Sequence, residues 1–258
     1  MIERAERAVR GLATGFCFAV FGLGQLALAF AVFPLLMLFM RDEVRRGRLA
    51  KNIVHLSMRI FVKVMSLTIL DFEARHLERL DRPGLLVLAN HPSLIDIVFL
   101  ISFIRQADCI VKATLLDNPF TRYAILAGGF IRNTGGPALV ESCGRSLALG
   151  NALIIFPEGT RSDPDGLREL QRGAANIAVR NRRDITPVVI RAREHNLGRH
   201  SRWWAAPKKR MSFEFEVGED IKIEPFLERK REAPAAAREL TEYLKNYFTE
   251  RTQVYGRA

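Results

Sequence analysis

Residues 84–106, GLLVLANHPSLIDIVFLISFIRQ, hold a strand signal and a helix signal side by side. Residues 84–90 form an apolar run that follows a Pro-Gly turn signal, which predicts a short buried strand. Residues 95–106 form a longer apolar stretch, which predicts a helix. A strand that passes through a polar turn into a helix is typical of α/β proteins.

The same alternation continues along the rest of the chain. The predicted strands are residues 109–113, 130–132, 152–156, 185–192 and 211–218, and the predicted helices are residues 51–70, 119–129, 137–150, 172–181 and about 234–250. Strands that alternate with helices predict an α/β fold with a mostly parallel central sheet flanked by helices. In such a sheet the functional site lies at the carboxyl ends of the strands.

The amino-terminal part of the chain has a different character, because residues 11–40 contain no charged residue. As one helix this segment would be about 45 Å long, compared with roughly 30 Å for the hydrocarbon core of a bilayer. A cleaved signal peptide has a shorter apolar core, and a buried helix of a soluble protein has a polar face. The sequence therefore predicts that this segment lies in a membrane.

Basic residues flank the apolar segment on both sides, namely Arg4, Arg7, Arg10, Arg41, Arg45, Arg46, Arg48 and Lys51. Positive flanks are typical of the cytoplasmic side of a membrane. Two arrangements fit: one tilted span, or two helices that enter one leaflet and return, with Gly22, Gly24 or Pro34 as break points. The two basic flanks favour the second. In both, we expect a membrane-embedded helical segment over residues 1–50 and a domain over residues 51–258 on the cytoplasmic face of the inner membrane.

Composition narrows the range of partners. The 258 residues include 39 Lys and Arg against 28 Asp and Glu, a net charge of +11, which favours polyanionic partners. Because no nucleic-acid-binding motif accompanies this charge, we expect anionic lipid and not nucleic acid. The segment between Arg191 and Arg210, with Trp203 and Trp204, suits either a lipid interface or a solvated loop. Three scattered cysteines without a CxxC pair argue against a disulfide scaffold or a zinc site.

Polar residues follow the predicted strand 84–90 in the segment NHPSLID, residues 90–96. Ser93 is a candidate helix N-cap, which would place Asp96 in the first helical turn. From there the Asp96 carboxylate can reach His91 and leave the other ring nitrogen as a proton acceptor, as activation of a hydroxyl requires. A simple capping pair of Ser93 and Asp96 beside an incidental histidine fits the same spacing.

A second polar segment, FPEGTRS, residues 156–162, follows the predicted strand 152–156. It combines a tight turn, a carboxylate, two hydroxyls and a guanidinium. Arginine binds phosphate with two parallel hydrogen bonds, and loop amides and hydroxyls add further donors. A phosphate-binding loop and an ordinary solvated turn with an ion pair both fit this segment taken alone.

Together the two segments resemble the glycerolipid acyltransferase family, of the lysophosphatidate (1-acylglycerol-3-phosphate) acyltransferase type. The specific part of the resemblance is the spacing from His91 to Asp96, followed about sixty residues later by FPEGTRS. Two weaker blocks, GFIR at 129–132 and ITPV at 185–188, also look like parts of the family pattern. The resemblance covers roughly residues 80–195, and a membrane-associated amino terminus is common in this family.

The resemblance implies transfer of a fatty acyl group from acyl-CoA or acyl carrier protein to a lysophospholipid hydroxyl, which converts lysophosphatidate to phosphatidate. It implies that His91 is the general base and that Asp96 orients it. The residues implied in binding the acceptor headgroup are Arg132, Glu158, Gly159, Thr160 and Arg161. It implies no metal and no cofactor besides the acyl donor.

The sequence departs from the family pattern near the expected acceptor site. No acidic residue follows Lys112 closely, and residues 133–136, NTGG, replace a more basic stretch after Arg132. Two alternatives therefore stay open: an acyltransferase of the same fold for a non-phosphate hydroxylated acceptor in a specialised lipid pathway, and an inactive basic membrane-binding protein. The intact set of His91, Asp96, Glu158 and Arg161 argues against the second.

Overall fold

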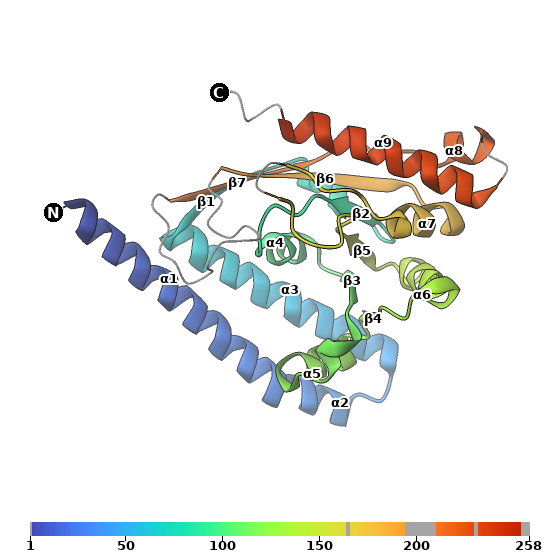
Figure 1. The fold of residues 1–258 in the computed structure, drawn as a ribbon. Helices are drawn as coiled ribbons and strands as arrows, with labels where there is room; N and C mark the ends of the chain where they lie inside the picture. The colour runs from blue at the N-terminus through green and yellow to red at the C-terminus, as the bar shows by residue number, and fades with distance from the viewer. Residues whose placement is uncertain (1, 164–165, 194–209, 230–231, 254–258) are drawn as a thin grey trace.

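A seven-stranded sheet forms the middle layer of the fold, in the order β1-β7-β6-β2-β5-β3-β4 (Figure 1). The computed structural model describes residues 2–163, 166–193, 210–229 and 232–253, so the predicted interface around Trp203 and Trp204 lies outside the described residues. The strands are β1 (Leu70–Arg75), β2 (Leu86–Ala89), β3 (Ala107–Val111), β4 (Ile131–Arg132), β5 (Ala152–Ile155), β6 (Ile185–Ala192) and β7 (Met211–Val217). All neighbouring pairs are parallel except β6 with β7, which confirms the predicted mostly parallel sheet.

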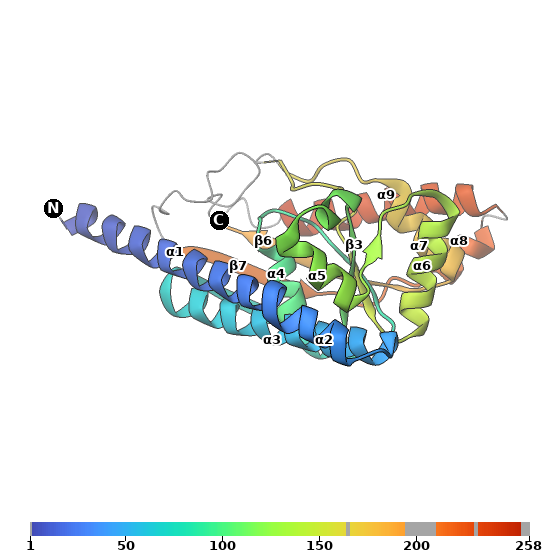
Figure 2. The same cartoon turned by 90° about the horizontal axis from the view of Figure 1, so that it is seen from below.

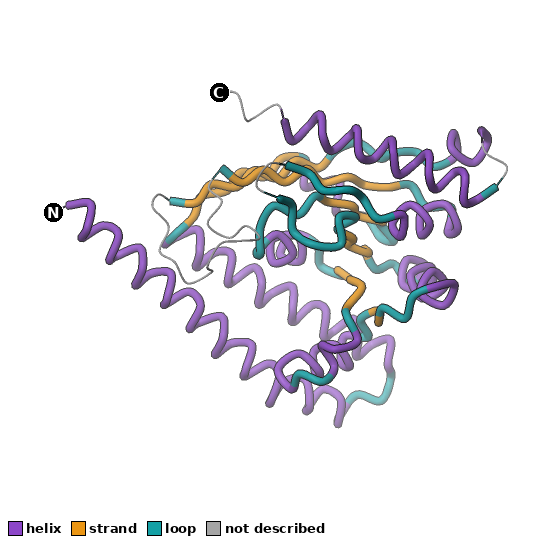
Figure 3. The backbone as a smooth tube through the Cα atoms, viewed as in Figure 1, coloured by secondary structure: helices purple, strands orange, loops and turns teal. Residues whose placement is uncertain are grey.

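Helices cover both faces of this sheet (Figures 1 and 3). The α-helices are α1 (Ile2–Ala27), α2 (Phe33–Phe39), α3 (Glu43–Thr68), α4 (Asp96–Phe103), α5 (Pro119–Gly128), α6 (Gly136–Ala148), α7 (Arg172–Asn181), α8 (Glu224–Arg229) and α9 (Ala233–Gln253). The helices α3 and α4 pack on one face, and α6, α7 and α9 pack on the other. Strand β1 and helix α8 had no counterpart among the predicted elements. The other predicted elements appear within a few residues of their expected bounds, except that α3 begins eight residues earlier.

Strand β2 separates two apolar cores. Leu86 and Leu88 belong to the core that includes α6, α7 and α9, whereas Val87 and Ala89 belong to the core that includes α3 and α4. All four side chains are buried because helices cover both faces of the sheet. This explains why the sequence of the strand is a continuous apolar run without alternation.

The amino-terminal helices form one long run that packs beside α3 (Figures 1 and 2). Residues Gly11–Phe39 have a mean hydropathy of 2.2 and are long and apolar enough, by length and composition, to cross a membrane. Only 17% of the most apolar part of this run is buried within the protein. Large apolar side chains therefore remain exposed along it, including those of Leu12, Phe16, Leu23 and Leu38.

The predicted break points do not interrupt this run. The chain stays helical through Gly22 and Gly24, and Pro34 lies in the first turn of α2, directly after a π-helical turn at Leu28–Val32. A proline is tolerated there because the wider turn and the helix start do not require its missing N–H. The chain reverses instead at residues 40–42, where the Asp42 carboxylate accepts the first N–H groups of α3. The expected domain boundary at residue 50 therefore falls inside a continuous helix.

A buried ion pair joins α3 to the sheet. Lys51 Nζ lies 3.1 Å from Asp108 Oδ2 at the start of β3, and both side chains are buried. The same carboxylate accepts hydrogen bonds from Ser146 Oγ at 2.6 Å and from the Cys109 N–H at 2.9 Å. Because each charge is desolvated, each depends on its partner, and the pair ties α3 to the sheet.

We expect Lys51→Met to lower the free energy of unfolding by about 3–5 kcal/mol, because the substitution leaves Asp108 buried without its cation. Chemical denaturation in detergent measures this loss. Lys63→Met, at an exposed position of the same helix, is the matched control and should leave the free energy of unfolding unchanged. Equal effects of the two substitutions would contradict a structural role for the ion pair.

Candidate active site

The two polar segments that follow β2 and β5 lie side by side. These strands are parallel neighbours with Leu86 opposite Leu153, so their carboxyl ends meet at the same edge of the sheet. Two hydrogen bonds join the segments: the Ser162 N–H donates to the His91 carbonyl at 2.7 Å, and the His91 N–H donates to Glu158 Oε1 at 2.9 Å. The fold thus brings together two motifs that are about sixty residues apart in the chain.

His91 and Asp96 form a hydrogen-bonded pair, with 2.8 Å between His91 Nδ1 and Asp96 Oδ2. The Asp96 side chain is 0% exposed, whereas 17% of the His91 side chain is exposed. Because the carboxylate accepts the Nδ1–H, the neutral ring carries its lone pair on Nε2. The imidazole can therefore accept a proton on the side away from Asp96.

Ser93 supports Asp96 in a different way from the one predicted. Helix α4 begins at Asp96, with Ile95 at the N-cap position, so Ser93 is not the helix cap. The Ser93 N–H instead donates to Asp96 Oδ2 at 2.7 Å, and the Ser93 hydroxyl donates to Asp96 Oδ1. Burial raises the pKa of the Asp96 carboxyl, and the hydrogen bonds from His91 and Ser93 oppose that rise. These donors therefore favour the ionised carboxylate that His91 needs as its partner.

The ring of Phe156 fixes the plane of the imidazole. The two rings are stacked, with 4.0 Å between their centroids and an angle of 17° between their planes. Phe156 directly follows β5, and it was not among the predicted site residues. The available signal was its place at the end of the strand that neighbours β2.

Glu158 holds the two segments together. Its side chain is buried, with 3% exposed, and Oε1 accepts both the His91 N–H at 2.9 Å and the Ser162 hydroxyl at 2.8 Å. Oε2 accepts the backbone N–H of Arg168 at 2.9 Å. Both carboxylate oxygens are thus bound by the chain itself, so the surroundings of Glu158 are those of a residue that positions the loop.

The next residues of this loop face outward. Gly159 and Thr160 are exposed and Arg161 is half-buried. Gly159 has a φ of +69°, a left-handed conformation that glycine adopts without strain and that turns the loop back at this point. The loop therefore places the Thr160 hydroxyl and the Arg161 guanidinium at the same edge of the sheet as His91.

Arg132 lies further from the His91–Asp96 pair. It ends β4, and the sheet order places β4 two strands beyond β5, a separation of about 10 Å between strand axes. Its side chain is exposed. The structure thus places Arg132 at the same edge of the sheet as His91 without bringing the two residues into contact.

The thiols of Cys109 and Cys143 are unsuited to nucleophilic chemistry. Burial raises the pKa of the Cys109 thiol to about 12 and that of Cys143 to about 11, so both stay protonated at neutral pH. Among the residues that the structure describes, no group of three or more His, Cys, Asp or Glu side chains is placed to hold a metal ion. The candidate chemistry at this edge of the sheet is therefore that of the His91–Asp96 pair.

Comparison with known proteins shows a similarity that includes both polar segments. The family model described as Acyltransferase matches residues 71–191, which include both polar segments. The chain is similar to the 1-acyl-sn-glycerol-3-phosphate acyltransferase of Helicobacter pylori, with 32% identity over 117 residues, and to that of Pseudomonas aeruginosa, with 25% identity over 185 residues. Over this region the chain is similar to members of the glycerolipid acyltransferase family.

The matched regions differ in extent between these family members. The match covers 43% of this chain and 49% of the Helicobacter protein, and 69% and 68%, respectively, for the Pseudomonas protein. The chain thus spans about half the length of the Helicobacter relative. The crystal structure of the 1-acyl-sn-glycerophosphate (LPA) acyltransferase PlsC from Thermotoga maritima has the same fold, with a TM-score of 0.70 at 21% identity over 99% of this chain and 98% of that one.

We expect Glu158→Gln to destabilise the protein by about 1–3 kcal/mol, because the amide nitrogen would face an N–H or hydroxyl donor in a buried site. Denaturant unfolding of the purified protein measures the change. Glu169→Gln is the control, because Glu169 is an exposed residue whose partner is the surface Lys245. If the two variants unfold at the same denaturant concentration, Glu158 does not hold the loops together.

Proposed function

We propose that this protein is a membrane-bound acyltransferase that moves a fatty acyl group to the free hydroxyl of lysophosphatidate and so forms phosphatidate. The donor is a thioester, acyl-CoA or acyl carrier protein, and no further cofactor takes part. The observation that carries this proposal is the 2.8 Å hydrogen bond between His91 Nδ1 and Asp96, which leaves Nε2 as a proton acceptor beside the FPEGTRS loop. The names of the relatives support the same acceptor.

In the proposed mechanism His91 acts as general base and then as general acid. Nε2 takes the proton of the acceptor hydroxyl as the oxygen attacks the thioester carbonyl carbon. The carbon–sulfur bond then breaks, the acyl group stays on the acceptor oxygen, and the imidazolium returns its proton to the leaving thiolate. Asp96 holds the ring in the required tautomer and stabilises the imidazolium between the two proton transfers.

The outer part of the FPEGTRS loop supplies the proposed headgroup site. The half-buried Arg161 guanidinium binds the acceptor phosphate, assisted by the exposed Thr160 hydroxyl, and Gly159 shapes the turn that presents both side chains. Glu158 holds the loop in place and does not bind the headgroup, because its two oxygens already accept hydrogen bonds from His91, Ser162 and the backbone of Arg168. Arg132 adds positive charge further along the same edge of the sheet.

The apolar helical run over Gly11–Phe39 supports the proposed attachment to a membrane. The lipid acceptor resides in the bilayer, and an enzyme held at the same surface meets it at high local concentration. Basic residues flank the run on both sides, which favours the cytoplasmic face of the inner membrane for the catalytic domain.

A second candidate follows from the surroundings of Arg132. Its side chain is exposed, its strand β4 lies about 10 Å from β5, and an uncharged segment, residues 133–136, follows it. This weaker concentration of positive charge favours, as the alternative, an acyltransferase of the same fold that acts on a hydroxylated lipid without a phosphate. The two candidates differ in whether the acceptor is recognised through an anion.

We expect His91→Ala to reduce acyl transfer about 10²–10⁴-fold, because general-base catalysis is lost. Asp96→Asn should cost as much or less, and the double variant should be far from additive because the two residues act as a unit. The assay follows transfer from both donor types to lysophosphatidate in membrane fractions. The variants should stay folded and stay in those fractions, and near-normal turnover of folded His91→Ala would refute the proposed mechanism.

We expect Arg161→Lys to raise the acceptor KM about tenfold or more, because an ammonium replaces a bidentate guanidinium on a phosphate. The donor KM should change little. Initial rates against each substrate measure this, with Arg132→Lys as a second test and Arg180→Lys, at an exposed position of α7, as the control. An acceptor KM that is unchanged in both test variants would favour the acceptor without a phosphate.

A further inference from the structure

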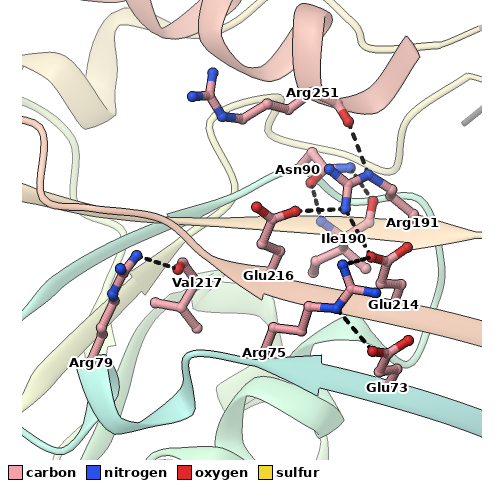
Figure 4. Close-up of polar contacts among 10 residues, drawn as sticks. All are labelled: Glu73, Arg75, Arg79, Asn90, Ile190, Arg191, Glu214, Glu216, Val217 and Arg251. Carbon is pink, nitrogen blue, oxygen red and sulfur yellow. Dashed lines mark hydrogen bonds and ion pairs between the residues drawn. The ribbon is translucent and has the colours of Figure 1, made fainter. Parts of the chain in front are cut away.

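Asn90 makes a two-way hydrogen-bonded contact with β6. Its Nδ2 donates to the Ile190 carbonyl at 2.7 Å, and its Oδ1 accepts the Ile190 N–H at 2.7 Å (Figure 4). The side chain is buried, with 3% exposed. Asn90 lies between the last residue of β2, Ala89, and the proposed base, His91, so its contacts bear directly on the backbone from which His91 projects.

The Asn90 amide takes the place of a peptide group in the sheet. Strand β6 continues to Ala192, although its partner β2 ends at Ala89, which is opposite Val188. A continued parallel strand normally supplies one carbonyl and one N–H to a residue in the position of Ile190. The asparagine amide offers the same two groups, so the main chain can leave the sheet while both polar groups of Ile190 stay paired.

Strand β6 is a firm support for this contact. Arg191, the next residue after Ile190, pairs with Glu216 at 2.9 Å and with Glu214 at 3.4 Å, both on β7, as Figure 4 shows. Its Nε also donates to the carbonyl of Arg251 in α9 at 2.9 Å. The backbone that Asn90 binds is therefore fixed to its neighbouring strand and to the helix above it.

The turn is held from its other side by Glu158, which accepts the His91 N–H at 2.9 Å. Residues 90 and 91 thus lie between two fixed supports, β6 on one side and the loop after β5 on the other. Asp96 and Phe156 contact the imidazole ring of His91, whereas Asn90 and Glu158 hold the backbone around it.

We propose that Asn90 is a positioning residue for His91: its amide replaces the missing strand partner and defines the backbone turn that aims Nε2 at the acceptor hydroxyl. The effect on turnover rests on the proposed acyltransferase function, whereas the effect on the His91 ring does not. Leucine has a similar size but neither the donor nor the acceptor, so Asn90→Leu removes both hydrogen bonds and leaves the two Ile190 groups unpaired.

The kinetic test compares Asn90→Leu with the wild type. We expect kcat to fall about 100-fold, because a displacement of about 1 Å at the reacting groups has an effect of that size. The KM values of both substrates should stay near those of the wild type, because the headgroup loop is unchanged. Asn151→Leu is the matched control: Asn151 is also a buried asparagine, it donates to Ser146, and it lies at the opposite end of the sheet. It should lower the melting temperature but not kcat.

A spectroscopic test is independent of activity. In ¹⁵N-histidine-labelled protein, the His91 signal, assigned by its loss in His91→Ala, should show a protonated Nδ1 and an unprotonated Nε2. We expect Asn90→Leu to change this signal and Asn151→Leu to leave it unchanged. An unchanged His91 signal in folded Asn90→Leu overturns the inference. If the wild type transfers no acyl group but Asn90→Leu still alters the His91 signal, the proposed function fails and the positioning role stands.

Discussion

The parallel pairing of β2 with β5 is the constraint on which the site depends. Leu86 lies opposite Leu153 and Leu88 opposite Ile155, so the turn after each strand begins at the same edge of the sheet. If β2 shifted by one residue relative to β5, each of its side chains would move to the opposite face of the sheet. Both faces are packed against helices, and this packing opposes such a shift. This register places the Glu158 carboxylate within reach of the His91 backbone and the Phe156 ring against the imidazole.

At the edge of the sheet that carries His91, buried polar groups bind the chain itself and more exposed polar groups face outward. Asn90, Asp96 and Glu158 are buried, and each is hydrogen-bonded to several groups of the chain. Inside the protein such bonds are strong and an unmade bond is costly, which gives the backbone around His91 a single conformation. Thr160 and Arg161 lie further out, where side chains can meet a ligand.

Helix α3 connects the apolar amino-terminal run to this framework. It packs beside α1, contributes Phe61, Val62 and Met65 to the core beneath the sheet, and holds β3 through the Lys51–Asp108 pair. The run formed by α1 and α2 buries little of its own apolar surface. An exposed apolar surface of this kind marks a site of membrane or protein contact. Helix α3 therefore connects the proposed membrane anchor to the sheet.

The sequence by itself determined the type of most elements and the two motifs, because periodicity and turn signals are local properties of the chain. It also predicted that His91 and Asp96 pair, since both lie within one turn of the chain. It missed β1, where Leu70, Phe72 and Ala74 alternate with charged residues in only six residues. Only the tertiary structure decided the hydrogen-bond partners of Glu158 and Asn90 and the separate place of Arg132. His91, which Glu158 binds, lies 67 residues away in the chain, and Ile190, which Asn90 binds, lies 100 residues away. Which polar group becomes buried against which strand depends on the order of the sheet.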